Sequence, residues 1–425
     1  MKRTISFLLA FVIMVNAHSM AFADSSSDSP IREISLQAAY DLALKDPVNL
    51  RLLVSQIGAI EKQENYLNWQ QDKLNNTDTG FTPSNLPTSF DYFMNLVPNY
   101  DELSPEEQVE FKQVANMQIL INNSLNQLLD GLSTQRQLEL EKELDNQRKI
   151  LSRNLRTLDS DHGKVALELS KIRETVKYYV AQKYIHLLTL ENDLNYLSLE
   201  NEYKKKQLED EQTLYQYGVA SQKTLEELKY AADKQNIDLD QKNKEYEYYL
   251  DELKLELGMP LSQDIRLLPV DIPLIELQPL NVSDLVNKNY ELLQSDQDVQ
   301  LASKNYDAAN SAESDTERQY LHAVWEVSIQ KRNLLEQQLE QKTRAYGSEE
   351  KAILSQIHMQ ELNYNKLLQQ KEDNQTRYRY GLITVKELEK SEIDLQKANQ
   401  LLENAKLSYA LFIAKLDLAK KGVIL

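Results

Sequence analysis

The stretch Thr213–Ser221 reads TLYQYGVAS, and Thr376–Thr384, 163 positions later, reads TRYRYGLIT. The same offset holds without a gap over about the next 35 residues. Within this region apolar residues recur every seven positions in both copies: Leu225, Ala232, Leu239, Tyr246 and Leu253 in the first, and Leu388, Leu395, Leu402, Tyr409 and Leu416 in the second. A seven-residue period keeps one stripe of a slightly underwound helix facing a partner. The chain is therefore predicted to contain an internal repeat of coiled-coil helices.

Gly218 and Gly381 are predicted to end the first helix of each repeat. A helix often closes on a residue in the left-handed conformation, which glycine adopts without a side-chain penalty. Ser221 and Thr384 follow three positions later, where an N-cap would begin a return helix. Thr384 and Glu387 also have the spacing of a capping box. Each glycine thus marks the predicted tip of an antiparallel helical hairpin.

The proline distribution predicts how the repeats are arranged along the chain. No proline occurs from Glu106 to Met259 or from Leu280 to Leu425, and long proline-free blocks are typical of long helices. The return helices are expected to end near Gly258 and Gly422. The predicted order is a first helical repeat over 24–259 with an irregular insertion at 75–108, a Pro-rich linker over 260–279, and a second helical repeat over 280–425. The predicted fold class is all-α, with two tandem repeats of long antiparallel coiled-coil hairpins.

The N-terminal residues have the pattern of a secretory signal peptide. Lys2 and Arg3 precede the apolar run Ile5–Val15, and Ala21-Phe22-Ala23 has the small-x-small form of a cleavage site. A signal peptide over 1–23 would leave a mature chain that begins at Asp24. The alternative is that this segment is retained as a membrane anchor. No later segment offers the run of about 18 apolar residues that a spanning helix needs.

Composition argues against several classes of protein. The sequence has no cysteine, so an exported chain must be held together by packing alone. Its net charge of −18 becomes −20 when Lys2 and Arg3 are removed with the signal peptide. Such a chain repels nucleic-acid phosphates, so nucleic-acid binding is not expected.

The order of these parts resembles that of the TolC-like outer membrane efflux proteins. A short capped helix opens each half, at Ile34–Ala43 and at Leu280–Val286. A tip of the Tyr-x-x-Gly-x-x-[Ser/Thr] type then leads into a heptad helix that closes on Leu-Gly or Lys-Gly. The resemblance covers about residues 33–75 and 170–425.

The resemblance implies a homotrimer whose helices curve into a hollow cylinder, with the hairpin tips at the mouth nearest the inner membrane. In the family, these tips meet a membrane-fusion adaptor protein that connects the tunnel to an inner-membrane transporter. The corresponding positions here are Tyr217, Gly218, Val219, Ala220, Ser221, Tyr380, Gly381, Leu382, Ile383 and Thr384. Glu387 falls where the family narrows the tunnel entrance with acidic side chains, although Lys390 stands where the next acid is expected. The alternative is that the tip residues only form the turn.

The sequence departs from the family where membrane β-strands are expected. Between Ala308 and Trp325 the segment 310–319 is charged and has no alternating pattern. The insertion at 75–108 carries Pro83, Pro87, Pro98 and Pro105, which favour a loop with short helices. We therefore predict a helical-barrel protomer without a β-barrel, and how it is held at a membrane stays open. The apolar cluster Phe90–Val97 could cap the tunnel, pack between subunits or touch a membrane surface.

No pattern of catalytic or metal-binding residues is found. The five histidines are scattered, no cysteine is present, and no Gly-rich phosphate loop or Gly-x-Ser-x-Gly motif occurs. We expect no cofactor, no metal and no enzymatic activity. The leading hypothesis is a conduit component of the cell envelope, in the outer membrane and periplasm, or at the cell surface if the envelope has no outer membrane. The alternatives are an exported coiled-coil spacer or scaffold and an exported hydrolase.

Overall fold

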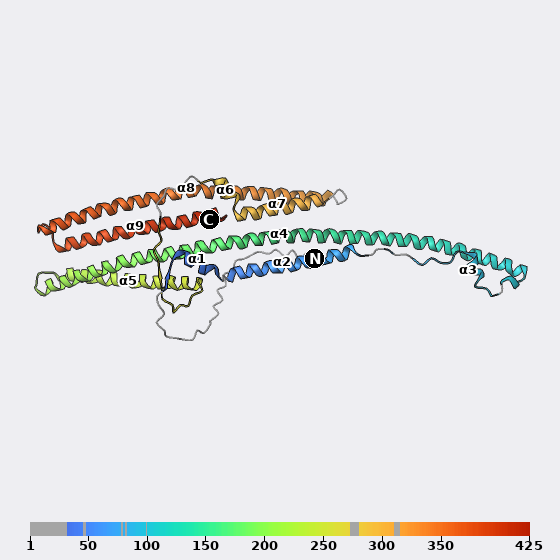
Figure 1. Ribbon diagram of the computed structural model, residues 1–425, viewed down its shortest axis with the longest axis horizontal. Helices are drawn as coiled ribbons and strands as arrows, with labels where there is room; N and C mark the ends of the chain where they lie inside the picture. Colours follow the sequence, from blue (N-terminus) through green and yellow to red (C-terminus); the bar gives the residue numbers. More distant parts are fainter. Residues whose placement is uncertain are drawn as a thin grey trace.

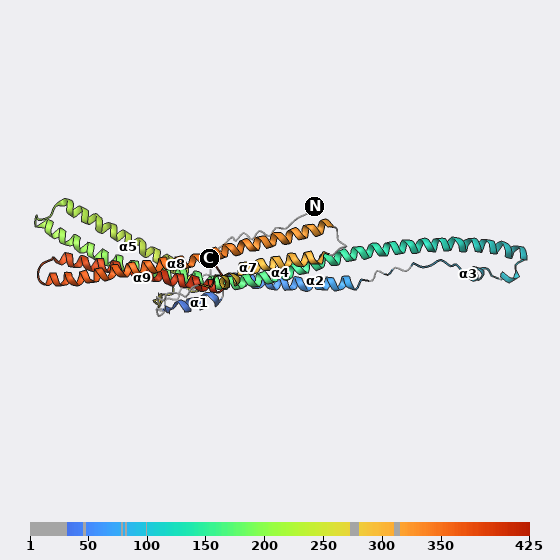
Figure 2. The ribbon, with the colours of Figure 1, turned by 90° about the horizontal axis from the view of Figure 1, so that it is seen from above.

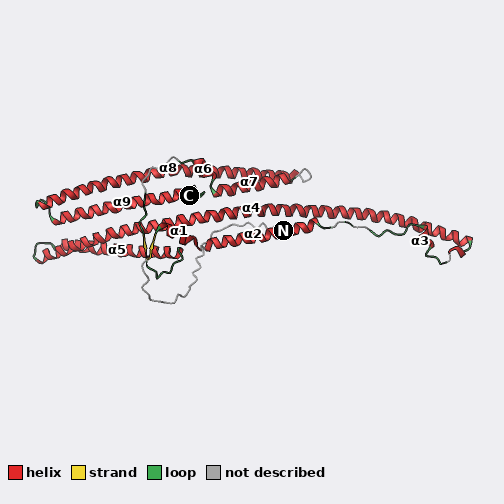
Figure 3. Cartoon of the chain, in the orientation of Figure 1, coloured by secondary structure: helices red, strands yellow, loops and turns green. Residues whose placement is uncertain are grey.

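The structure is a computed structural model that describes residues 32–45, 48–77, 80, 83–98, 100–272, 280–309 and 315–425. The predicted signal peptide lies outside these residues. The described elements follow one another as β1 (Arg32–Ile34), α1 (Leu36–Lys45), α2 (Val48–Asn75), α3 (Phe90–Met94), the 3-10 helix η1 (Tyr100–Glu102), α4 (Pro105–Gln216), α5 (Gln222–Glu256), β2 (Ile265–Leu267), α6 (Val282–Asn287), α7 (Tyr290–Ala308), α8 (Asp315–Arg379) and α9 (Val385–Lys420). They form an elongated bundle of nearly parallel and antiparallel helices (Figure 1). Among the described residues the strands are limited to the short β1 and β2 (Figure 3), so the predicted all-α class is confirmed.

The two halves contain equivalent hairpins. Helices α4 and α5 form the first hairpin, and helices α8 and α9 form the second. The 163-residue offset found in the sequence relates the end of α4 at Gln216 to the end of α8 at Arg379, and the start of α5 at Gln222 to the start of α9 at Val385. The return helices are also alike, with 35 residues in α5 and 36 in α9. The internal repeat therefore corresponds to a repeated structure.

Both hairpin turns have the predicted geometry. Gly218 has φ +72° and Gly381 has φ +69°, in the left-handed region that favours glycine. The N–H of Val219 donates to the carbonyl oxygen of Leu214 at 2.9 Å, as in a Schellman motif. Leu382 donates in the same way to Arg377, also at 2.9 Å.

The long helix α4 is the main difference between the halves. It has 112 residues against 65 in α8, and by the offset the start of α8 corresponds to Ser152. Residues 105–151 of α4 are therefore an addition to the first half, about 70 Å long. In Figure 2 this extension, with α3 at its far end, runs beyond the other helices. The sequence predicted an irregular region with short helices at 75–108, where the structure has α3 and η1, but it did not predict one uninterrupted helix of this length.

The halves are held together along α4 by polar contacts with α7 and α9. Toward the extension, Lys171 pairs with Glu291 at 3.0 Å. Toward the tips, the carboxylate of Asp193 accepts hydrogen bonds from the side-chain amides of Gln400 at 2.5 Å and Asn404 at 2.9 Å. Hydrogen bonds to a charged group are stronger than neutral ones, so these contacts stabilise the packing of the two hairpins, together with Leu407 of α9, which is buried in the core of the first half.

A small parallel β-ladder lies beside the middle of α4. Strand β1 pairs with β2, with Ile34 opposite Leu267. This pairing was not predicted from the sequence, because β2 belongs to the segment 260–279 that was predicted to be only a Pro-rich linker. Ile265 and Leu267 are buried in the core of the first half, so this part of the segment is anchored. Residues 273–279 of the linker lie outside the described residues.

Tyr184 of α4 ties the ladder to the helical bundle. Its side chain is fully buried, and its hydroxyl lies 2.8 Å from the carbonyl oxygen of Ile34 and 2.6 Å from that of Leu268. Burial raises the pKa of Tyr184 to about 12, which outweighs the hydrogen bond to Leu268. The phenol therefore stays protonated and donates to this pair of carbonyls at neutral pH.

Replacing Tyr184 with Phe is expected to lower the free energy of unfolding by about 1–3 kcal/mol, because two buried carbonyl oxygens lose a donor. Urea unfolding followed by circular dichroism measures this change. The control is Tyr230→Phe, since Tyr230 is exposed and lies on α5. Equal stability of the two variants would show that the Tyr184 hydroxyl does not anchor the ladder.

The turn geometry predicts opposite effects of alanine at two glycines. A Cβ added at Gly381 or at Gly347 meets no atom within 4 Å, so only the backbone conformation distinguishes the two sites. Gly381→Ala is expected to destabilise the protein by about 1–2 kcal/mol, because its φ is positive. Gly347→Ala, inside α8, is expected to stabilise it by about 0.5–1 kcal/mol. Changes of the same sign in urea unfolding would contradict the assigned turn.

Candidate docking site at the hairpin tips

Both hairpin tips lie at the same end of the molecule (Figure 1). Each tip exposes a tyrosine on one side of its glycine and an aliphatic side chain on the other. The exposed fractions are 78% for Tyr217 and 73% for Val219 in the first tip, and 77% for Tyr380 and 68% for Leu382 in the second. Large apolar side chains with so little contact inside the chain mark a surface that another protein can cover.

The other predicted tip residues form the edges of this surface. Ala220 and Ile383 are half-buried, each next to an exposed aliphatic residue. Ser221 and Thr384 are the N-caps of α5 and α9: the Ser221 hydroxyl accepts from the N–H of Thr224 at 3.1 Å, and the Thr384 hydroxyl accepts from the N–H of Glu387 at 3.2 Å. The structure thus brings the ten predicted residues together in two apices, with the caps beside the apolar side chains.

Glu387 completes a capping box in the second tip. Its carboxylate accepts from the backbone N–H of Thr384 at 2.8 Å and from the Thr384 hydroxyl at 3.0 Å. These two hydrogen bonds lower the pKa of Glu387 below its ordinary value. The residue is exposed and ionised at neutral pH, and it also stabilises the first turn of α9.

Two ion pairs connect the hairpins just behind the tips. Lys386 of α9 lies 3.3 Å from the carboxylate of Asp210 of α4, and Lys206 of α4 pairs with Glu389 of α9. These charged residues are on the predicted helices, but nothing in their spacing shows which helices become neighbours. Sequence reasoning therefore missed them. Both pairs are partly exposed, so each contributes little energy, but they connect the two hairpins close to the apices.

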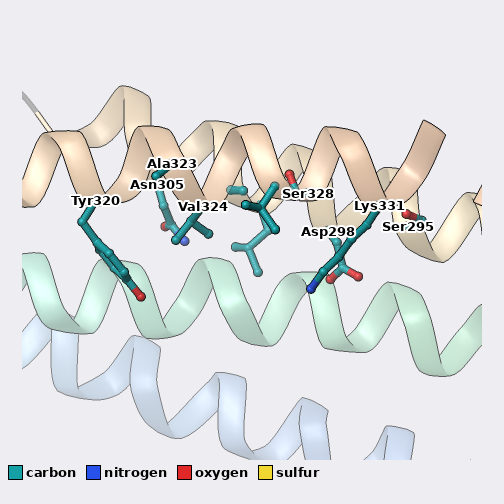
Figure 4. A pocket seen from close by; sticks show the side chains of 11 residues that line it. Ser295, Asp298, Asn305, Tyr320, Ala323, Val324, Ser328 and Lys331 are labelled. Atoms are coloured by element: carbon teal, nitrogen blue, oxygen red, sulfur yellow. The ribbon is translucent and has the colours of Figure 1, made fainter. Parts of the chain in front are cut away.

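A groove runs between α7 and α8, away from the tips. It has a volume of about 620 Å³ and is lined by Leu301 of α7 and by Tyr320, Val324 and Val327 of α8. Figure 4 shows Tyr320 at one end of the groove and Lys331 at the other. Tyr320 is 65% exposed, so the apolar wall of the groove is open to solvent.

A second groove lies between α2 and α4, and Leu67, Trp69, Leu74 and Ile150 line it. Trp69 stacks on Tyr66, with ring centroids 5.9 Å apart, and both rings are exposed. Helices α2 and α8 run along opposite edges of the molecule (Figure 1). The α7–α8 pair and the α2–α4 pair each carry an open apolar groove.

Two other features, a metal site and a membrane-spanning helix, are absent from the described residues. Within the described residues, no group of three or more His, Cys, Asp or Glu side chains is arranged to hold a metal ion. In the same part of the chain, no helix has both the length and the apolar character needed to cross a bilayer.

Comparison with known proteins places the fold. A scan against protein-family models finds no match, and a search of curated protein sequences finds none either. Solved structures do match. The outer membrane protein VceC from Vibrio cholerae has a TM-score of 0.56 and 11% identity, and the match covers 92% of this chain and 97% of that one.

Two further structures match over similar lengths. CusC, described in terms of folding and transmembrane channel formation, has a TM-score of 0.58 and 12% identity, with 91% of this chain and 92% of that chain covered. A membrane protein from Pseudomonas aeruginosa has a TM-score of 0.60 and 10% identity, with 95% and 96% covered. These neighbours are membrane and channel proteins rather than enzymes. Identities of this size show the fold alone, and the chain has the fold of the TolC-like outer membrane channels.

Proposed function

We propose that this chain is one subunit of a conduit in the cell envelope, and that its hairpin tips dock onto a membrane-fusion adaptor of an inner-membrane transporter. The observation that carries the proposal is the pair of matching apices, Tyr217–Ser221 and Tyr380–Thr384, at one end of a fold shared with outer membrane channels. No catalytic step is assigned to the chain.

Ring formation is supported by the surface that one chain leaves open. The open grooves of the α7–α8 and α2–α4 pairs are two different surfaces. When one such surface of a subunit binds the other surface of the next subunit, the contact is heterologous, and it forms a ring when the rotation from one subunit to the next divides a full turn evenly. Three copies, as in the resembled family, form the proposed ring.

The chemistry of the tips suits a second helical hairpin. Tyr217, Val219, Tyr380 and Leu382 offer apolar area without a formal charge. The glycines have no side chain, so an opposing hairpin apex can approach the backbone closely. Buried aromatic residues commonly supply much of the binding energy in such contacts. Glu387, ionised and exposed beside the second apex, is proposed to face the entrance of the tunnel.

The first test is the mass of the mature protein in solution. Size-exclusion chromatography with light scattering is expected to give about three times the mass of the mature chain, because three copies close the grooves. A mass of one chain at micromolar concentration would argue against the conduit and favour the alternative, an exported coiled-coil spacer.

The second test is adaptor binding. The double variant Leu382→Asp and Ile383→Asp is expected to abolish capture of an adaptor protein encoded in the same genome, because two charges would be buried in the contact. The control is Leu255→Asp at the other end of α5, where Leu255 is 64% exposed. Circular dichroism verifies that both variants stay helical. Undiminished binding by the tip variant would remove the docking assignment and leave the ring untouched.

A further inference from the structure

One line of side chains on α4 joins the two halves of the chain. Four of its members contact the second half: Lys164, Lys171, Asn192 and Lys206. They are separated by multiples of seven residues, so they lie on one stripe of a coiled-coil helix, here called the α4 line. Their partners are, in the same order, Asp298 and Glu291 of α7 and Asn404 and Glu389 of α9. The second half thus holds the α4 line with two of its helices.

The equivalent line of α8 is exposed. The 163-residue offset converts the α4 line into an α8 line with a member every seven residues over about 75 Å. All eight members are exposed and none carries a charge: Tyr320, Val327, Leu334, Gln341, Ser348, Ser355, Leu362 and Gln369. Two further exposed apolar residues, Val324 and Met359, flank the α8 line. On α4, by contrast, the members from Lys164 to Asn192 are half-buried or buried.

The first half has a matching surface on α5. Helix α5 is the equivalent of α9, and the offset places Gln241 at the position of Asn404 and Tyr248 at that of Leu411. In α9, Asn404 contacts α4 and Leu411 packs against the core of the first half. In α5, both Gln241 and Tyr248 are exposed. The face of α5 that corresponds to the α4-binding face of α9 is therefore uncovered.

Helix α2 has a matching surface as the equivalent of α7. Each of these helices packs along the long helix of its own half and has a buried leucine as its third residue, Leu50 or Leu292. This alignment places Leu52 at the position of Gln294, which donates to the carbonyl oxygen of Lys164 at 3.2 Å. Leu52 is 62% exposed, so α2 has an open apolar residue where α7 meets α4.

The open surfaces of α8 and of α2 and α5 do not meet within one chain. Helix α8 packs on α6, α7 and α9, whereas α2 and α5 pack on α4. In Figure 1, α7 and α9, and then α4, lie between α8 and the pair α2 and α5. A second copy of this chain offers α2 and α5 on a surface that the repeat already matches to α8. The internal repeat thus indicates what covers the α8 line.

We propose that the α8 line binds α2 and α5 of a second copy of this chain, in the arrangement in which α4 binds α7 and α9 within one chain. This inference rests on the proposed ring and names the contact between its subunits. The two joined surfaces are different, so the contact is heterologous and passes from each copy to the next. It lies between neighbouring repeats rather than across the axis, so the passage stays open.

The chemistry of the α8 line suits a contact between copies. Inside one chain the halves are connected covalently, so ion pairs such as Lys171 with Glu291 are enough to hold them. Two separate chains with a net charge of −18 repel each other. On the α8 line Leu334 takes the position of Lys171, so burial of this side chain is favourable and adds no charge. Repulsion is therefore smallest along the surface on which the copies meet.

Cysteine cross-linking tests the contact, because the chain has no cysteine of its own. Within one chain the side-chain amide of Asn192 donates to that of Asn404 at 3.0 Å. The offset converts this pair into Ser355 of one copy and Gln241 of the next. The double variant Ser355→Cys and Gln241→Cys is expected to give covalent dimers and trimers with a bis-maleimide long enough to link Asn192→Cys to Asn404→Cys inside one chain.

Two controls isolate the contact. Each single variant is expected to stay uncrosslinked, because a heterologous contact does not bring two copies of one residue together. Asn243→Cys replaces Gln241→Cys in the matched control, since Asn243 is also exposed but lies about 200° further round α5. Ser355→Cys with Asn243→Cys should therefore give no linked chains.

The outcomes separate the contact from the ring. An oligomer by light scattering without linked chains from Ser355→Cys and Gln241→Cys overturns the contact and leaves the proposed function standing. Equal linking in the Asn243→Cys control does the same. A monomeric wild-type protein overturns both proposals. Dimers from Ser355→Cys alone would show a two-fold contact and would also overturn both.

Discussion

The packing of α4 is the constraint on which the rest of the structure depends. An isolated helix is marginal in water and is stabilised mainly by burying one face. Along its length α4 contacts α1, α2, α3, α5, α7 and α9, so both hairpins and the β-ladder are positioned against this one helix. The halves then have a fixed relation to each other, and the two glycine turns fall at the same end. Where these contacts end, toward Pro105, apolar side chains of α4 such as Val114 and Met117 are exposed to solvent.

Much of the fold could be predicted from the sequence because its signals are local. The turn at Gly381 needs a residue that tolerates positive φ, and the cap at Thr384 needs a hydroxyl three positions before Glu387. Both requirements are satisfied within a few residues of chain. The same interpretation applies to Gly218 and Ser221, because they occupy the corresponding positions of the first repeat. The two turns were predicted in this way, whereas the docking role of the ten tip residues was implied by the family resemblance and stays a prediction.

The features that the sequence did not predict depend on contacts between distant segments. The pairing of β1 with β2 joins residues more than 200 positions apart in strands of three residues, too short to show alternation. The ion pair of Lys386 with Asp210 and the cluster around Asp193 depend on which helices become neighbours. The unbroken length of α4 was also not predicted, because the prolines before Pro105 indicate a loop and carry no information on the length of the helix that follows.

The central claim is that this fold functions as a ring of identical subunits with a passage along its axis. Equivalent hairpins, apolar tips and two open apolar grooves on different helix pairs are all explained by such an assembly. Electron microscopy of the purified mature protein tests the claim most directly through end-on views. A ring of three subunits should give three-fold symmetric end-on views with a central opening. Rod-shaped particles of a single chain, with no ring in any view at protein concentrations well above micromolar, would contradict the proposed ring.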